Sequence, residues 1–351
     1  MTDPIAIVHD NLTQRAPDGF GGAIIIEINS TTVLKEGYGW AERAQQRPFT
    51  PNTIAQIGSL TKQFTATAVV DLACRGELDV ADAISRYLPQ VPPAAAGITL
   101  HQLLTHAAGL PEEIGDDFDL VSRDDLITRG LSHLNSAATG TFAYSNLGYS
   151  LLAAVVEIVA SQSLEKHLAE WFFIPLGMTR TGTFFDESLR DAMAYGTADA
   201  GAQPPISDRI QAIAPDYWNL KGNGGLQSTV EDMATWYHAL AHGPVVDAAM
   251  RKLLLAPHVW RGTPHADVAY GYGWFIRTRV DGTLEQVSHT GSDGVCYAAF
   301  VWRPLDRIFT YVVTNTGEKV GAEVASMVLR LLRELRSDQL PRRSDAVRRA
   351  E

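Results

Sequence analysis

Segments with strand character lie at the two ends of this 351-residue chain, and the long middle is helical in pattern. Residues 21–28 (GGAIIIEI) and 32–37 (TVLKEG) flank the polar pair Asn29-Ser30 and predict a β-hairpin. β-Rich runs return much later, at residues 270–279, 286–289, 295–302 and 308–315. Because strands satisfy their backbone groups by pairing, the two ends should build one antiparallel sheet, with the middle of the chain as an insertion.

The middle of the chain has helical periodicity interrupted by proline and glycine. After a short opening helix, we expect helices at about 59–75, 99–106, 122–134, 145–160 and 163–173, long loops at 180–225, and helices at about 229–241 and 318–336. This predicts an α/β fold of the α+β type: an antiparallel β-sheet flanked by N- and C-terminal helices, plus an inserted all-helical subdomain. The expected boundaries are 1–80 and 220–336 for a discontinuous sheet domain, 81–219 for the helical insert and 337–351 for a disordered tail.

Composition is that of an ordinary globular protein, with 46% hydrophobic residues, 20% charged residues and a formal net charge of -11. A nucleic-acid binder would show a basic stripe, so we expect no nucleic-acid partner. The first residues lack the pattern of a secretory signal and no run approaches the length of a membrane span, so we expect a cytoplasmic protein with no membrane partner. Cys74 and Cys296 are too few for a disulfide framework, and both thiols are expected to be reduced and buried.

The segment Ser59-Leu60-Thr61-Lys62 places a hydroxyl and an amine three residues apart at the expected start of a helix. Residues at i and i+3 share one face of a helix, so Ser59 and Lys62 can meet. A neutral lysine can take the proton of a serine, and a helix N-terminus favours the negative charge that develops during acyl transfer. The pair therefore predicts a serine nucleophile with its own base.

The same spacing occurs in Ser163-Leu164-Glu165-Lys166, so spacing alone does not identify a catalytic pair. In that second segment Ser163 resembles a helix N-cap, and Glu165-Lys166 resembles a solvated helical face. Ser59 could equally be an ordinary N-cap and Lys62 an ordinary surface residue. Other stretches of the chain have to separate the two pairs.

Three such stretches accompany the first pair. Residues 139–146 (TGTFAYSN) put Tyr144 and Asn146 at a junction between a loop and an apolar helix, residues 287–292 (VSHTGS) lead into a strand, and residues 103–110 (LLTHAAGL) end a helix. In this order and spacing they resemble the serine β-lactamase-like hydrolases: class C β-lactamases, DD-carboxypeptidases, D-aminopeptidases and related esterases. The resemblance runs from about residue 24 to 335 and includes residues 49–53 (FTPNT), 76–80 (GELDV), 174–178 (IPLGM) and 224–229 (GGLQST).

The resemblance implies a β-lactamase/transpeptidase-like fold and a catalytic role for each matching residue. Ser59 would be the acylated nucleophile, Lys62 its proton partner, and Tyr144 the general base or proton shuttle. Asn146 would hold Lys62 and the substrate amide. Unperturbed tyrosine and lysine both titrate near ~10, so the choice of Lys62 or Tyr144 as the resting base stays open at this point.

The resemblance also implies the substrate side of the site. His289-Thr290-Gly291 would line it on a strand, and the backbone amides of Ser59 and Ser292 would form the oxyanion hole. Most β-lactamases have lysine where this chain has His289. A mostly neutral histidine should attract a substrate carboxylate less strongly, which points away from a dedicated β-lactamase and toward the DD-carboxypeptidases and D-aminopeptidases that carry His-Thr-Gly.

Tyr217-Trp218-Asn219 repeats the Tyr-x-Asn pattern but has no helix junction after it. Tyr217 and Trp218 are candidates for the wall of the substrate pocket, and core aromatics under a long loop are the alternative. His106 is expected to order the turn at Gly109. The remaining pair with i, i+4 spacing, His238 and His242, lacks the glutamate of a His-Glu-x-x-His site, so we expect no metal and no cofactor.

Together these features predict a metal-independent serine hydrolase that forms an acyl-enzyme at Ser59 and cleaves a small-molecule ester, amide or peptide, as an esterase or a D-aminopeptidase or DD-peptidase does. A β-lactamase is one alternative, and a catalytically silent binding protein similar to the penicillin-binding proteins is another. No Gly-x-Ser-x-Gly occurs, which disfavours an α/β-hydrolase. The oligomeric state and the physiological substrate do not follow from the sequence.

Overall fold

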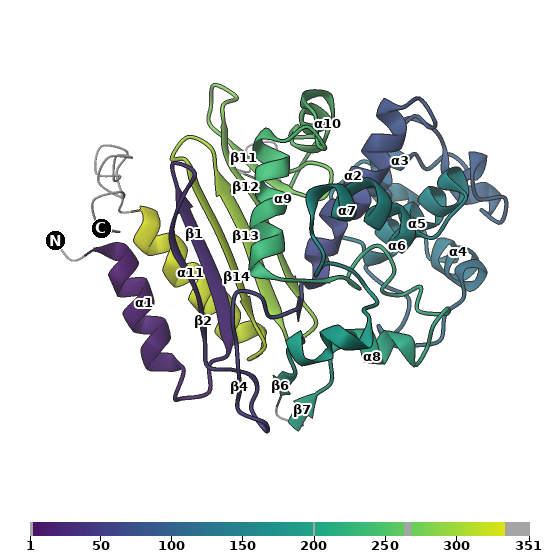
Figure 1. Cartoon of the computed structure of the whole chain (residues 1–351). Coiled ribbons are helices and arrows are strands. Elements are labelled where there is room, and N and C mark those ends of the chain that lie inside the picture. The colour runs from purple at the N-terminus through teal and green to yellow at the C-terminus, as the bar shows by residue number, and fades with distance from the viewer. Residues whose placement is uncertain (1–2, 199–200, 263–267, 334–351) are drawn as a thin grey trace.

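The computed structural model describes residues 3–198, 201–262 and 268–333 (Figure 1). Within these residues, eight antiparallel strands form one sheet in the order β2-β1-β14-β13-β12-β11-β10-β9. Their bounds are β1 (Gly22–Ile28), β2 (Thr31–Tyr38), β9 (Val259–Trp260), β10 (Ala269–Tyr270), β11 (Phe275–Thr278), β12 (Leu284–Ser292), β13 (Tyr297–Arg303) and β14 (Ile308–Thr314). β1 pairs with β14 along its whole length, which confirms the prediction of a sheet assembled from both ends of the chain.

Helices cover both faces of the sheet, as Figure 1 shows. α1 (Pro4–Arg15) and α11 (Glu318–Arg333) lie on one face, and α9 (Val230–His242) packs against β1 and β14 on the other. Every residue of β1 is buried, because alternate side chains such as Ile24 and Ile25 belong to the hydrophobic clusters on opposite faces. The flanking helices predicted from the two ends of the chain are therefore confirmed.

The helical part lies on the same side of the sheet as α9, as Figure 1 shows. Its longer members are α2 (Thr61–Cys74), α4 (Arg123–Ser132) and α5 (Asn146–Ala160). Shorter members are α3 (Leu100–Leu104), α6 (Leu164–Leu168), a π-helical segment (Ala169–Phe173), α7 (Ile174–Leu176), α8 (Ile206–Gln211) and α10 (Ala248–Leu254). One hydrophobic cluster joins the two parts, since it contains Ile25 of β1, Phe64 of α2 and Leu152 of α5. The sheet and the helices therefore share a continuous core.

Several local expectations differ from the structure. The run predicted at 270–279 is split into β10 and β11, where Gly273 adopts a positive φ, and β12 is longer than the predicted 286–289. The loops expected at 180–225 contain α8 and two short strands, β6 (Gly196–Ala198) and β7 (Gly201–Gln203), and β8 (Gln227–Ser228) follows just beyond. The sequence also does not predict β3 (Trp40–Glu42), β4 (Arg47–Pro48) and β5 (Ala55–Gln56), because strands of two or three residues carry too little periodicity to be recognised.

The cysteine prediction is half wrong. Cys296 is buried, but Cys74 is exposed, because it ends α2 on the side away from the core. The tail predicted at 337–351 lies outside the described residues. Among the described helices none is individually long and apolar enough to cross a bilayer, and only α5 joined to residues 164–176 passes that test, with a bend of 74° between the two.

Candidate active site

Ser59 and Lys62 meet at the start of α2. Ser59 lies in a 3₁₀ turn, η1 (Gly58–Leu60), and the α-helix proper begins at Thr61. Lys62 Nζ lies 3.0 Å from Ser59 Oγ. The predicted contact between residues three apart is therefore present, although Ser59 precedes the α-helix instead of forming its first turn.

The Lys62 amine is fully buried and surrounded by acceptors. Besides Ser59 Oγ, Nζ donates to Asn146 Oδ1 at 2.7 Å and to the backbone carbonyl of Asn223 at 2.9 Å. Burial lowers the pKa of Lys62 to about 7, while the carboxylates of Glu112 and Asp117 act in the opposite direction. A large fraction of Lys62 is therefore the neutral amine near pH 7, the form that can accept a proton from serine.

Tyr144 reaches the same serine from the helical side. Ser145 caps α5, since its Oγ accepts from the amide of Gly148 at 3.0 Å, and this places Tyr144 immediately before the helix. The Ser59 side chain lies near enough to the Tyr144 hydroxyl to lower its pKa slightly, and Lys62 Nζ lies 4.9 Å from the centre of the Tyr144 ring. Burial raises the pKa of Tyr144 above its ordinary value. Tyr144 therefore keeps its proton near pH 7, and Lys62 is the better resting base of the two.

His106 supports Tyr144 as well as the turn that the sequence assigned to it. Its backbone has a positive φ of 56°, its Nδ1 accepts from the amide of Ser145 at 3.0 Å, and its ring centre lies 4.3 Å from that of Tyr144. Burial and the nearby Lys62 lower the pKa of His106 well below its ordinary value. His106 is therefore a neutral ring that holds the segment carrying Tyr144 and the cap of α5.

Two glycines allow the backbone around Ser59 to touch β12. A Cβ on Gly58 would lie 2.6 Å from the amide nitrogen of Ser292, and Gly58 also has a positive φ of 51°. A Cβ on Gly291 would collide with the carbonyl oxygen of Ile57 and lie 2.7 Å from the amide nitrogen of Ser59. The amides of Ser59 and Ser292 therefore lie beside this close contact, which is compatible with the predicted oxyanion hole.

Replacing Gly291 with alanine should separate η1 from β12, because there is no room for the added Cβ between the two backbones. We expect a loss of about 1–3 kcal/mol in the free energy of unfolding, and a fall in kcat on the order of 10²-fold as the two amides move apart. Gly97→Ala is a matched control, since its Cβ would have nothing within 4 Å. Chemical denaturation and ester hydrolysis measure both effects, and normal kcat in Gly291→Ala would contradict this assignment.

The structure agrees with the expectation that His289 is neutral, and it places the side chain in the interior. Its side chain is buried, with 2% exposed, whereas the neighbouring Thr290 is exposed. Nδ1 lies 2.6 Å from the carbonyl oxygen of Thr290 and donates to it, so Nε2 accepts from the hydroxyl of Tyr270 at 3.1 Å. Burial, with a smaller effect of Lys62, lowers the pKa of His289 to about 3. His289 is thus an uncharged internal residue and presents no charge to a substrate carboxylate.

Tyr217 and Trp218 are also internal. They are 3% and 6% exposed, and each belongs to a hydrophobic cluster. The Tyr217 hydroxyl donates to Glu165, and both rings lie about the Lys221 ammonium, with centres 5.1 Å and 4.8 Å from its Nζ. The structure therefore favours the alternative of core aromatics over a substrate-pocket wall.

The second Ser-x-x-Lys pair, Ser163 and Lys166, has a structural role. Ser163 caps α6 by accepting from the amide of Lys166 at 3.2 Å, as expected. Glu165 is not the solvated residue that the sequence suggested, because it is largely buried against Lys221 and Tyr217.

His238 pairs with Glu27 at 3.1 Å, and the described residues contain no cluster of histidine, cysteine or carboxylate side chains able to hold a metal ion.

Two contributors to the site were missed by sequence reasoning. The Asn223 carbonyl is a backbone group, so no side-chain motif could reveal that it accepts from Lys62, although Asn223 adjoins the matching segment 224–229. The sequence predicts Tyr270 only as a strand residue, and its bond to His289 joins β10 to β12 across β11. Both contacts depend on segments that are distant in sequence.

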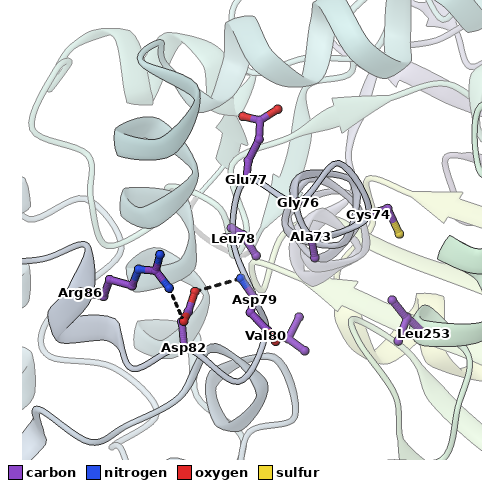
Figure 2. A pocket seen from close by; sticks show the side chains of 10 residues that line it. All are labelled: Ala73, Cys74, Gly76, Glu77, Leu78, Asp79, Val80, Asp82, Arg86 and Leu253. Atoms are coloured by element: carbon purple, nitrogen blue, oxygen red, sulfur yellow. Dashed lines mark hydrogen bonds and ion pairs between the residues drawn. The ribbon is translucent and has the colours of Figure 1, made fainter.

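A separate hollow of about 510 Å³ lies around the end of α2, as Figure 2 shows. Cys74, Glu77 and Asp82 line it, and Asp82 accepts from Arg86 at 2.6 Å and from the Asp79 amide at 2.9 Å. None of its lining residues belongs to the Ser59 set, so this hollow is not part of the candidate active site.

Comparisons with known proteins show which proteins this chain resembles. A family model described as Beta-lactamase matches residues 9–333. A penicillin-binding protein of Bacillus subtilis (strain 168) is 26% identical over 318 residues, which cover 86% of this chain and 69% of that protein. Protein flp of Staphylococcus aureus (strain COL) is 28% identical over 341 residues, which cover 92% of this chain and 61% of flp. The chain thus spans about three-fifths of the length of flp.

Solved structures resemble the fold closely. The octameric penicillin-binding protein homologue from Pyrococcus abyssi superposes with a TM-score of 0.77 at 25% identity, over 96% of this chain and 79% of that one. A penicillin-binding protein from Bacillus halodurans gives a TM-score of 0.75 at 24% identity, over 93% of this chain and 99% of that one. The architecture of a split antiparallel sheet with a helical insert is therefore shared with these proteins.

Proposed function

The chain belongs to the Beta-lactamase family, and on that premise we propose that it is a metal-independent serine hydrolase that forms an acyl-enzyme at Ser59 on an ester or amide substrate. The observation that carries the proposal is the position of the fully buried Lys62 amine, 3.0 Å from Ser59 Oγ, with a pKa lowered to about 7. A lysine that served only as a surface residue would be exposed and would hold its proton near pH 7.

In the first half of the proposed reaction, Ser59 Oγ attacks the carbonyl carbon of the substrate while neutral Lys62 Nζ takes the hydroxyl proton. The new Oγ–C bond pushes an electron pair onto the carbonyl oxygen, and the amides of Ser59 and Ser292 stabilise that charge. When the carbonyl re-forms, the bond to the alcohol or amine breaks. The proton held by Lys62 passes through the Tyr144 hydroxyl to this leaving group.

The second half repeats these roles with water as the nucleophile. Water attacks the acyl carbon and gives its proton to Lys62 by way of Tyr144. As the intermediate collapses, the bond from the acyl carbon to Ser59 Oγ breaks, and Lys62 returns the proton to the serine. The carboxylic acid is released and the resting state is restored.

The charges around the site support an esterase or a D-aminopeptidase-like activity over a carboxylate-binding one. His289 is uncharged, and the carboxylates of Glu112 and Asp117 act on Lys62. Glu113 and Asp293 add negative charge near Asp117, and together with burial they raise its pKa. Lys62 and Arg209 act in the opposite direction but do not cancel this effect, so the positive charge of Arg209 offsets the negative charge only in part. We therefore propose a substrate that is neutral or positively charged next to the scissile bond.

Three p-nitrophenyl esters with acyl chains of similar length test this charge preference: butanoate, 4-aminobutanoate and succinate. We expect kcat/KM to be highest for the ammonium ester and lowest for the carboxylate ester, with roughly tenfold between the two at low ionic strength and less at high salt. A strong preference for the succinate ester, or for the carboxylate-bearing cephalosporin nitrocefin, would favour the β-lactamase alternative instead.

The silent-binder alternative is tested by mass spectrometry. Incubation with a fluorophosphonate or with penicillin should add mass to Ser59, and a fluorescent ester should be turned over many times per active site. An adduct that forms without ester turnover would favour a binding protein of the penicillin-binding type. Absence of any adduct on Ser59 would remove the proposed chemistry altogether.

A further inference from the structure

A cluster of buried charges lies behind the site and takes no part in the proposed reaction. Lys221 Nζ lies 2.7 Å from Glu157 Oε1 and 3.4 Å from Glu165 Oε1, and the three side chains are only 9%, 13% and 21% exposed. Glu157 also accepts from the amide of Leu164 at 3.1 Å, and Tyr217 donates to Glu165. The cluster thus joins residues 217–221 to α5 and α6.

The same segment supplies an acceptor to the site. Asn223, two residues after Lys221, presents its carbonyl to Lys62 at 2.9 Å, and its side chain donates to Ser150 Oγ of α5 at 2.8 Å. Between them, the carbonyl of Gly222 accepts from Thr65 Oγ1 of α2 at 2.7 Å. Residues 221–223 are therefore held on one side by α2 and on the other by α5, and the ammonium of Lys221 is the charged member of this attachment.

Stability alone is a weak reason for such a cluster. Burying three ionised groups carries a large desolvation cost, and an apolar set of similar volume is often as stable or more so. Charged groups with directional hydrogen bonds, in contrast, hold one backbone arrangement against its alternatives. A small displacement of the Asn223 carbonyl would remove one of the partners that orient the Lys62 amine toward Ser59.

We propose that Lys221 and Glu157 are positioning residues for the reaction at Ser59: their ion pair fixes residues 221–223 and so holds the Asn223 carbonyl on Lys62. This inference rests on the proposed function, because a positioned amine matters only if Lys62 acts on Ser59. Neither side chain touches the reacting atoms, so the effect must pass through the backbone of Asn223.

The test is the double variant Lys221→Met/Glu157→Gln, which removes one positive and one negative charge and leaves the net charge of the protein unchanged. The side-chain amide introduced at position 157 keeps an oxygen for the backbone N–H of Leu164. The matched control is Lys166→Met/Glu170→Gln, which removes an exposed ion pair of 3.3 Å nearby with the same change in composition. Lys221→Arg, which keeps the cation, is the conservative variant.

With p-nitrophenyl butanoate, we expect kcat of the double variant to fall on the order of 10- to 100-fold with KM within about twofold, because the acylation geometry is disturbed and the binding surface is not. On the acid side of the kcat/KM profile (the acid limb), the midpoint pH should decrease by about 1 unit. The carbonyl acceptor stabilises the ammonium form of Lys62, so losing the carbonyl favours the neutral amine. The other groups that face Lys62, namely Tyr144, Tyr149, His106, His289, Glu112 and Asp117, are unchanged in this variant. The control pair and Lys221→Arg should keep the wild-type pH profile.

The outcomes separate this inference from the proposed function. If the wild-type protein forms no adduct on Ser59 and hydrolyses no ester, the proposed function fails. If the wild type is active and the folded double variant keeps both its kcat and its acid limb, while losing only thermal stability, the cluster is structural and the positioning role is wrong. Should the double variant not fold, Glu157→Gln alone must still reproduce the kcat fall without a KM change.

Discussion

Replacing Ser59 with alanine is expected to abolish turnover, with a fall in kcat on the order of 10⁶-fold, because the reaction loses its only proposed nucleophile. The side chain is partly buried at the start of α2, and its removal takes away one acceptor of the Lys62 amine. The fold should remain intact, since η1 is held by backbone contacts with β12. Hydrolysis of p-nitrophenyl esters and fluorophosphonate labelling measure the loss directly.

Ser163→Ala is the matched control for this experiment, because Ser163 and Lys166 repeat the same sequence spacing. Ser163 caps α6 through the Lys166 amide, so its loss should cost about 1 kcal/mol of stability and leave turnover unchanged. If Ser59→Ala retained wild-type activity, or if labelling moved to Ser163, the assignment of the nucleophile would be wrong.

Lys62→Met is expected to reduce kcat by about 10⁴-fold or more, since the resting base is removed while the volume of the side chain is nearly kept. It should also change how stability depends on pH. The ordinary pKa of lysine is 10.5, and burial lowers that of Lys62 to about 7. Between these values the unfolded chain binds a proton that the folded protein does not, so wild-type stability rises with pH across this window.

The methionine variant has no such group, so its free energy of unfolding should lack this rise. The free energy of unfolding of the variant minus that of the wild type should therefore be larger at about pH 6 than near pH 10. We expect this change to be about 3–5 kcal/mol, on the basis of roughly 1.4 kcal/mol for each pKa unit. Denaturation curves at the two pH values measure the difference. The exposed Lys166→Met variant should show no comparable change, and an identical pH dependence in Lys62→Met and the wild type would mean that Lys62 stays charged in the folded protein.

The architecture and the central pair were accessible from the sequence for a clear reason. β-Rich runs at both ends and helical periodicity between them require one sheet built from both ends, which the pairing of β1 with β14 confirms. The i, i+3 spacing brings Ser59 and Lys62 together within one turn, and the capping serine at 145 places Tyr144 before α5. The last two relations join residues close in sequence, and the sheet follows from strand patterns that are each local although the paired strands are far apart in the chain.

The state of each group in the site depended on residues far away. His289 lies in a recognisable motif, but its burial, its bond to Tyr270 and its pKa of about 3 follow from the packing of β10 and β12 and not from the motif. The same holds for Glu165, which a helical pattern would leave in solvent and which Tyr217 and Lys221 enclose. A motif names the residue type, but it does not say which other chain segments exclude water from it.

Lys62 depends both on local sequence and on tertiary packing. Its chemical identity and its distance from Ser59 could be predicted from four consecutive residues. The choice of Lys62 over Tyr144 as the resting base could not, because it depends on desolvation by the surrounding core and on a carbonyl 161 residues further along the chain. Local sequence sets the spacing of groups along a helix, whereas proton affinity depends on the dielectric and the charges that tertiary packing places around them.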